Sequence, residues 1–156
     1  MPIDEGGFRA AMSHFASGVT VVTTEHDGKR YGMTVASFAS LSLHPPLVVV
    51  CIERSVQSHD AIAAAGRFGV SILAQDQADV SGRFASKRDD KFDGVAVREG
   101  ELGVPLIEGA ICTLECRIQQ QLPGGDHSIF VGEVVDAQMR EAAPLVYFRS
   151  AYRELS

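Results

Sequence analysis

Four short segments of the sequence carry the residue types that could do chemistry. Residues 32–40 and 51–58 are rich in serine and threonine, residues 84–92 hold three basic side chains within five positions, and residues 124–127 place a histidine after two glycines. Hydroxyl groups, backbone N–H groups and cationic side chains are the donors that bind phosphate and other anions. The sequence offers no recognisable acid–base dyad. The pattern therefore indicates ligand binding.

Two of these segments have features that favour binding of a phosphorylated ligand. Residues 51–58 run from a predicted buried strand into a helix start, whose free N–H groups and positive dipole suit a phosphate, and Arg54 adds a charge. Residues 84–92 are the best remaining source of positive charge. A histidine such as His127, at the tip of a glycine-containing hairpin, rarely serves to pack a core.

Each segment also has an ordinary structural explanation, which the residues alone leave open. The serines and threonines could cap helices and satisfy turns. The cations of residues 84–92 could be neutralised by Asp89, Asp90 and Asp93 in a solvated loop. A single surface histidine is usually inert.

Composition and missing motifs exclude several classes of protein. The 14 basic and 20 acidic side chains give a net charge of −6, which argues against a general nucleic-acid or anionic-membrane binder. The sequence lacks the nucleophile elbow, the zinc-protease motif, the phosphate-binding P-loop and the dinucleotide fingerprint. Its five histidines do not pair at ligand spacing, so we expect neither a Rossmann dehydrogenase nor a metal site.

The cysteines and the apolar pattern indicate one globular domain, residues 1–156, in the cytoplasm. Cys51, Cys112 and Cys116 lie among apolar residues and are odd in number, which favours core packing in a reducing compartment over disulfides. The sequence shows neither a signal peptide nor a run of the roughly 20 apolar residues that a membrane span needs.

Periodicity predicts short helices and six or seven strands, arranged mainly as hairpins. We expect helices over residues 8–18, 55–65 and 76–85, with Ser58 and Asp76 as caps, and strands over residues 19–24, 31–38, 47–52, 68–72, 110–121, 128–139 and 145–148. Asp27-Gly28 predicts a tight hairpin turn. The architecture is therefore an antiparallel barrel or sandwich, and because residues 128–139 are apolar on both faces we expect a homodimer.

Taken together, the motifs resemble the short-chain flavin reductases, the reductase components of two-component flavin-dependent monooxygenases. The resemblance covers nearly the whole chain. Its carrying residues include Phe8-Arg9, Gly18-Val19-Thr20, Gly32-Met33-Thr34, Ser40, Pro45-Pro46-Leu47, Arg54, Ser58, Phe84-Ala85, Asp90-Lys91-Phe92, Gly125-Asp126-His127 and Pro144-Leu145-Val146-Tyr147. It implies a mainly β fold, an antiparallel split β-barrel with two or three short helices that dimerises and holds FMN or FAD near the subunit interface.

The resemblance also implies roles for individual residues. The isoalloxazine ring is expected against Thr34 and Ser37 with the backbone of Val35 and Ala36, and the ribityl phosphate against Cys51, Ile52, Glu53, Arg54 and Ser58. Lys91 and Phe92 would close the pocket, with Ser40 and Phe84 as further flavin positions. His127 would lie beside the nicotinamide, assisted by Tyr152. Ala36 departs from relatives that carry a polar residue there, which leaves the choice of flavin open.

The implied activity is hydride transfer from NADH or NADPH to FMN or FAD, whose reduced form serves a separate oxygenase component. Such chemistry belongs to the coenzymes and needs neither a protein nucleophile nor a metal. Two alternatives stay open. The chain could retain FMN and act on another small molecule, as split-barrel pyridoxamine phosphate oxidases do, or it could be a non-catalytic flavin-binding electron carrier.

Overall fold

The structure, a computed structural model, describes residues 2–155, so the two end positions of the predicted domain lie outside the described residues. The helices are α1 (Glu5–Met12), α2 (Gln57–Ala65) and α3 (Ala78–Ala85), with a 3-10 turn η1 (Gln75–Gln77) before α3. The strands are β1 (Ser17–Gly18), β2 (Thr20–His26), β3 (Lys29–Val35), β4 (Phe38–Ser42), β5 (Leu47–Glu53), β6 (Arg67–Ile72), β7 (Val97–Glu99), β8 (Pro105–Ile107), β9 (Cys112–Gly124), β10 (His127–Met139), β11 (Val146–Phe148) and β12 (Ala151–Arg153).

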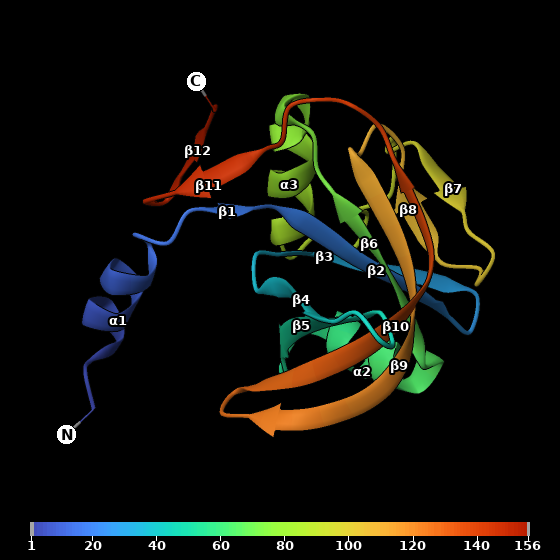
Figure 1. Ribbon diagram of the computed structural model, residues 1–156, viewed down its shortest axis with the longest axis horizontal. Helices are drawn as coiled ribbons and strands as arrows, with labels where there is room; N and C mark the ends of the chain where they lie inside the picture. The colour runs from blue at the N-terminus through green and yellow to red at the C-terminus, as the bar shows by residue number, and fades with distance from the viewer. Residues whose placement is uncertain (1, 156) are drawn as a thin grey trace.

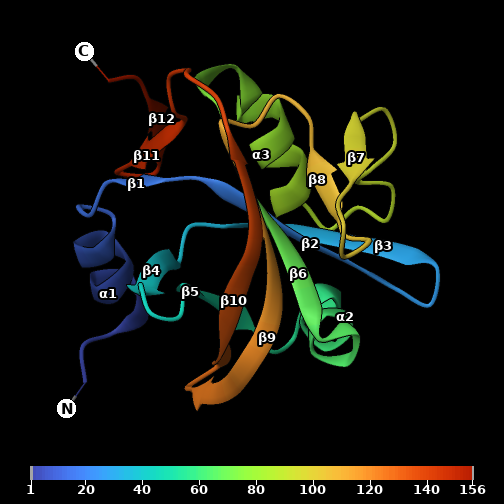
Figure 2. The same cartoon turned by 45° about the vertical axis from the view of Figure 1, so that its right-hand side comes forward.

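Seven of these strands form one antiparallel sheet in the order β3-β2-β6-β9-β10-β5-β4. Its two edge strands, β3 and β4, follow each other directly in the chain, so the sheet must curve until its edges approach (Figures 1 and 2). The long β9–β10 hairpin lies in the middle of this sheet, and its register shifts twice, as β-bulges cause where a strand bends. The predicted mainly β, antiparallel architecture with two or three short helices is confirmed, and the described residues contain three α-helices.

The main core fills the inside of this curved sheet. Val22, Val50, Ile52, Phe68 and Phe130 are fully buried there and form one cluster. A second cluster lies beneath α3 and contains Val21 and Phe84. Since Val21 and Val22 point to opposite faces, β2 is covered on both sides, which explains its β-branched run without exposed positions.

The Asp27-Gly28 turn is confirmed as the connection between β2 and β3. Both residues have positive φ angles, 52° and 76°, as the tight hairpin turn requires. His26 then pairs with Lys29, and the register continues without interruption to Thr20 opposite Val35. This hairpin carries the sequence from Lys29 to Val35 along one edge of the sheet.

Several predicted element boundaries are wrong. The first helix ends at Met12, well before Gly18, and none of its residues is buried, because its apolar face has no partner within this chain. The predicted strand 31–38 ends at Val35, because the chain turns at residues 36–37 to pass from β3 to β4. The strands β1, β4, β7, β8 and β12 were not predicted, since they are short or exposed, and the residues of β1 were instead assigned to the end of the first helix.

Neither predicted helix cap is correct. The helix after β5 is capped at Val56 by no side chain, and Ser58 is buried in its first turn instead. Ala74, rather than Asp76, begins the turn before α3, where the Gln77 side chain accepts from the Ala74 N–H at 2.9 Å. The long amide of Gln77 reaches back to that N–H and takes the role that was assigned to Asp76.

The cysteines are free, and Cys116 is fully buried in the main core. Burial, with a smaller contribution from the charge of Glu115, raises the pKa of the Cys116 thiol to about 12. Burial also raises the pKa of Cys112, which is half-buried. Core packing is therefore confirmed for Cys116, whose thiol stays protonated and unreactive.

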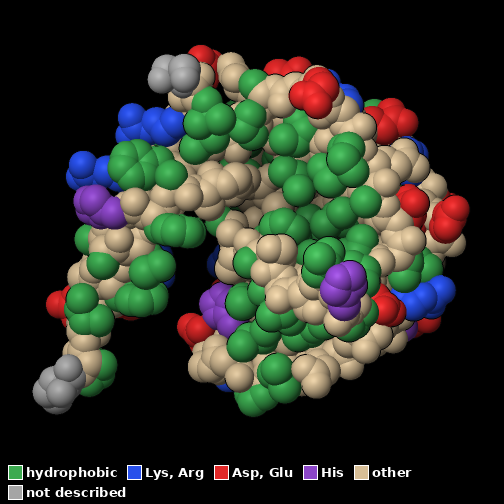
Figure 3. Space-filling model, viewed as in Figure 1, with side chains coloured by type: hydrophobic (Ala, Val, Ile, Leu, Met, Phe, Trp, Pro, Cys, Tyr) green, Lys and Arg blue, Asp and Glu red, His purple; other side chains and the backbone are tan. Residues whose placement is uncertain are grey.

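The arm formed by α1 projects from the body of the protein, and hydrophobic side chains lie along it (Figure 3). Phe8, Met12 and Phe15 are 56%, 52% and 76% exposed. One backbone hydrogen bond, from Arg149 N–H to Ser13 C=O at 2.8 Å, joins the end of this arm to the β11–β12 hairpin. No helix among residues 2–155 has the length and apolar character needed to cross a bilayer.

Candidate functional site

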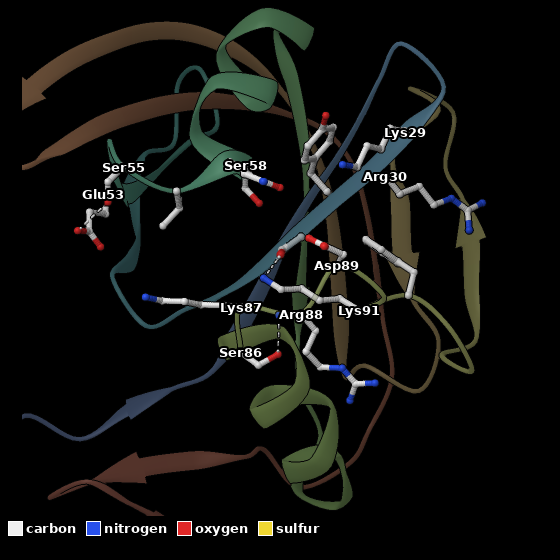
Figure 4. A pocket seen from close by; sticks show the side chains of 15 residues that line it. Lys29, Arg30, Glu53, Ser55, Ser58, Ser86, Lys87, Arg88, Asp89 and Lys91 are labelled. Carbon is white, nitrogen blue, oxygen red and sulfur yellow. Dashed lines mark hydrogen bonds between the residues drawn. The ribbon is translucent and has the colours of Figure 1, made fainter.

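A cavity of about 420 Å³ lies between the β2–β3 hairpin, the start of α2 and the loop that follows α3 (Figure 4). Its lining residues are Lys29, Arg30, Tyr31, Gly32, Glu53, Ser55, Val56, Gln57, Ser58, Ser86, Lys87, Arg88, Asp89, Lys91 and Phe92. Five of these side chains are basic and two are acidic. On a chain with a net charge of −6, the cavity is a local concentration of positive charge.

The start of α2 supplies backbone donors to one wall of the cavity. The N–H groups in the first turn of any α-helix have no intrahelical acceptor. At α2 no side chain caps them, and Gln57 and Ser58 line the cavity. The positive end of the helix dipole therefore faces the same space as the basic side chains.

The loop after α3 forms a second wall and is held in shape by Arg83. Its Nε donates to the Lys91 carbonyl at 2.6 Å, and its Nη2 donates to the Asp90 carbonyl at 2.8 Å. One guanidinium thus fixes the backbone of the loop, whose residues Ser86, Lys87, Arg88, Asp89 and Lys91 line the cavity.

The charges in this loop are only partly neutralised within it. Arg88 donates two hydrogen bonds to the Asp90 carboxylate at 2.7 and 2.8 Å, and this pairing lowers the pKa of Asp90 to about 2. Lys91 instead donates to the carbonyls of Gly32 and Phe84 at 3.1 and 3.2 Å. Burial lowers the pKa of Lys91, since no carboxylate offsets its desolvation.

The predicted ring-binding segment, residues 34–37, lies beside this cavity and does not line it. Thr34 Oγ1 donates to the Ser81 carbonyl at 2.6 Å, and Ser81 Oγ lies 2.6 Å from Tyr152 Oη. Thr34, Ser81 and Tyr152 therefore connect β3, α3 and the C-terminal hairpin. Ser37 Oγ donates to the Cys51 carbonyl at 2.9 Å, which fixes the segment against β5.

His127 lies at the start of β10, directly opposite Glu53 at the end of β5. Its Nδ1 is 2.7 Å from Asp126 Oδ1, and this hydrogen bond lowers the pKa of Asp126. The Arg54 N–H donates to the Asp126 carbonyl at 3.0 Å. The hairpin tip is thus fastened to the strand end that leads into α2, with the histidine ring 40% exposed.

A buried histidine that sequence reasoning missed supports this junction. His59 Nε2 lies 2.8 Å from Ser128 Oγ, and its Nδ1 lies 2.9 Å from Asp60 Oδ1. His59 also packs edge-on against Phe130. It joins α2 to β10 next to His127, and because 69 residues separate His59 from Ser128 no local pattern could have indicated the contact.

The structure brings some predicted site residues together and separates others. Glu53, Ser58, Lys91 and Phe92 line the cavity. Phe84 is fully buried beneath Gly32 and packs edge-on against Phe92, with ring centroids 5.0 Å apart, so it lies under the cavity floor. The remaining predicted positions that do not line the cavity are Thr34, Val35, Ala36, Ser37, Ser40, Cys51, Ile52, Arg54, His127 and Tyr152.

At two of these remaining positions the side chain is too deeply buried to contact a ligand. Val35 is almost completely buried and Ile52 is fully buried, so only their backbone groups could meet a ligand. Ala36, Ser37 and Ser40 are exposed on the path from β3 into β4. The hairpin residues Lys29, Arg30 and Tyr31, which line the cavity, were not predicted, because only closure of the sheet brings that hairpin to α2.

The comparison with known proteins agrees with this geometry. Residues 12–156 match the family described as the flavin reductase like domain, and the chain belongs to that family. It is 44% identical over 151 residues, 97% of this chain and 81% of the relative, to the reductase component of 4-nitrophenol 4-monooxygenase/4-nitrocatechol 2-monooxygenase from Rhodococcus opacus. It is 40% identical over 149 residues, 95% of each chain, to the reductase component of 4-hydroxyphenylacetate 3-monooxygenase from Thermus thermophilus.

A solved structure supports the same assignment. The NADH:FAD oxidoreductase SgcE6 of Streptomyces globisporus superposes with a TM-score of 0.95 at 37% identity, covering 100% of this chain and 96% of that one. That protein has also been solved with NAD and FAD fragments. The split β-barrel that the resemblance implied is confirmed, and the chain is an oxidoreductase of the flavin reductase type.

Proposed function

We propose that this protein is an NAD(P)H-dependent flavin reductase that supplies reduced FMN or FAD to a separate monooxygenase component. The observation that carries the proposal is the cavity that combines the uncapped start of α2 with basic side chains on an otherwise acidic chain. A phosphorylated flavin fits this donor set, since amide, hydroxyl and ammonium groups are the usual partners of a phosphate.

Each part of the site has a distinct role in this proposal. The α2 start and Lys87 bind the phosphate end, and residues 34–37 hold the ring at the edge of the sheet. His127, oriented by Asp126, positions the nicotinamide. When both coenzymes are bound, hydride passes between them, so the protein contributes placement and charge balance rather than a nucleophile.

Anaerobic mixing of the purified chain with excess flavin and either NADH or NADPH tests the proposal through loss of flavin absorbance. Reduction of many flavin equivalents for each protein supports a free-flavin reductase. Reduction of a single equivalent would instead indicate an enzyme that retains FMN and serves another acceptor. If neither nicotinamide reduces any flavin, the chain is a carrier and the proposed activity is wrong.

We further propose a homodimer in a reducing, cytoplasmic environment. The exposed apolar face of α1 supports the dimer, because an isolated amphipathic arm needs a partner surface to cover it. The three free cysteines support the reducing compartment.

A further inference from the structure

Ser128 is a polar residue on the inner face of β10, where the strand pattern favours apolar side chains. Ser128 and Phe130 are buried, whereas His127 and Ile129, between and beside them, are only partly buried. This alternation places Ser128 on the core side of the strand and His127 on the other side. A buried hydroxyl group loses its hydrogen bonds to water and needs a partner within the protein. The partner of Ser128 is His59 on α2, whose Nε2 lies 2.8 Å from Ser128 Oγ.

The surroundings of His59 fix the direction of this hydrogen bond. The Asp60 carboxylate, 2.9 Å from His59 Nδ1, can only accept, so Nδ1 carries a proton. In the neutral ring Nε2 then accepts from the Ser128 hydroxyl group. The ring also packs edge-on against Phe130, with centroids 5.4 Å apart. His59 is therefore held at both nitrogens and at its ring, and it offers Ser128 an acceptor in one defined place.

The pair contributes direction more than stability. A buried hydrogen bond adds little net free energy, because water offers equivalent bonds to the unfolded chain, and an apolar pair of the same shape can replace it at little cost. An apolar pair would leave the rotation of β10 against α2 less defined. Within residues 2–155, no other hydrogen bond joins α2 to β10. The orientation of these two elements at this point therefore depends on the His59–Ser128 contact.

Ser128 lies where the β9–β10 hairpin leaves the body of the protein. Residues 119–126, which form the projecting tip, are all exposed, and Ser128 is the first buried residue after them (Figure 1). His127 lies between the exposed tip and this buried position. Because successive side chains of a strand point to opposite faces, an inward Ser128 that is held by His59 sets the outward direction of His127.

The other contacts that hold His127 are exposed to water. They are the hydrogen bond between His127 Nδ1 and Asp126 Oδ1 at 2.7 Å and that from Arg54 Nη1 to the His127 carbonyl at 3.4 Å. Water competes for hydrogen bonds of this kind, whereas the Ser128–His59 pair is shielded from it. The buried pair is therefore the fixed point from which the orientation of His127 is set.

We propose that His59 is a positioning residue for hydride transfer: through Ser128 it sets the direction of His127, and thereby the placement of the nicotinamide ring. The proposal rests on the proposed flavin reductase function and on the role given there to His127. His59 itself contacts no coenzyme. Its loss should therefore lower kcat more than it raises the KM for NADH, because the rest of the coenzyme still binds and only the reacting ring is less well placed.

Ser128→Ala and its matched control, Ser71→Ala, distinguish this role from a structural one. Ser71 is fully buried in β6, where its Oγ accepts from the Ile107 N–H at 3.0 Å, so each variant removes one buried hydroxyl group. Both should lower the melting temperature to a similar extent. We expect only Ser128→Ala to lower kcat, by about fivefold to tenfold, the loss of one hydrogen bond at His127 being the upper limit. Equal kcat values for the two variants would overturn the proposal.

His59→Asn and His59→Gln separate the contributions of the two ring nitrogens. The asparagine amide can take the place of Nδ1 beside Asp60, and the glutamine amide that of Nε2, so only glutamine keeps an acceptor for Ser128. We expect His59→Asn to show the loss of kcat and His59→Gln to recover it to within about twofold of the wild type, with flavin affinity unchanged in both. An equal loss of kcat in the two variants would mean that the contact with Ser128 does not matter.

The double variant His59→Asn/His127→Ala tests whether His59 acts through His127. A residue that acts only through another adds nothing once the other is removed, so kcat should equal that of His127→Ala alone. A further loss as large as that of His59→Asn by itself would overturn the proposal and leave the reductase function intact. If the wild-type chain reduces no flavin with either nicotinamide, the proposed function itself is wrong, and the role of His59 falls with it.

Discussion

His127 combines exposure with a fixed orientation, which is what a coenzyme-positioning side chain needs. Its Nδ1 is committed to Asp126, while the other ring nitrogen has no partner among the described residues. The backbone beneath it is fastened to β5 and to Arg54. The free nitrogen can therefore meet a ligand without reorganisation of the site.

Replacement of His127 by alanine should lower kcat/KM for NADH about tenfold, the loss that one hydrogen bond to a polar group gives, and leave flavin affinity unchanged. Steady-state kinetics and a flavin titration on the same sample measure both quantities. His26→Ala is a matched control, since His26 also pairs with a neighbouring aspartate, Asp27 at 3.4 Å, but lies at the end of β2 rather than at the tip of the β9–β10 hairpin. Wild-type kinetics in His127→Ala would show that His127 does not position the nicotinamide.

Gly132 is a residue whose small size the core requires. A Cβ at this position would lie 2.6 Å from Phe68 Cζ and 2.9 Å from Cys116 Cβ, closer than real contacts. Gly132→Ala should therefore lower the free energy of unfolding by about 1–3 kcal/mol. Gly82, exposed on α3 with no atom near its would-be Cβ, is the control, and Gly82→Ala should add up to about 1 kcal/mol. Denaturant titrations measure the free energy of unfolding of both variants. An unchanged unfolding midpoint for Gly132→Ala would show that the core accepts a methyl group at this position.

At the scale of elements, the β11–β12 hairpin stores backbone strain. Arg149 and Ser150 both have positive φ angles, 51° and 62°, which cost roughly 1 kcal/mol or more for residues other than glycine. The hairpin nevertheless stays closed, since Tyr147 packs against Tyr152 and Tyr152 Oη bonds to Ser81.

Relief of this strain should stabilise the protein. Ser150→Gly is expected to raise the free energy of unfolding by about 1 kcal/mol and the melting temperature by roughly 2–4 °C. Ala151→Gly, one position further on in β12 where φ is ordinary, should lower both quantities. Calorimetry on the two variants tests the contrast, and a fall in stability for Ser150→Gly would show that the turn is unstrained.

The elements also show which features a sequence can predict. The β2–β3 hairpin was predictable because Asp27-Gly28 specifies its turn locally. The β9–β10 pair was predictable because two long, largely apolar stretches lie on either side of Gly124-Gly125. The start of α2 was misplaced, since Val56 caps it without a polar side chain and Ser58 is buried. The cavity was predictable only in part, because Lys29 reaches it through closure of the sheet and not through its neighbours in sequence.

For the whole molecule, the exposed apolar side chains of the N-terminal arm are the reason to expect a homodimer. A monomer would leave Phe8, Met12 and Phe15 in water, although burial of each such side chain contributes about 1.5–3 kcal/mol. The double variant Met12→Ser/Phe15→Ser should therefore convert a dimer into a monomer, as measured by light scattering after size-exclusion chromatography. Met139→Ser, at an equally exposed position far along β10, is the control and should stay dimeric. A wild-type chain that is monomeric at micromolar concentration would contradict the expected homodimer.

The gathering of every lysine in one cavity has a practical consequence. Reagents that couple to side-chain amines, such as activated esters used for dyes or for surface immobilisation, can react with lysines only at Lys29, Lys87 and Lys91. Labelling of this kind would block the cavity, and protection of these amines by a bound ligand becomes a footprint that mass spectrometry can read directly.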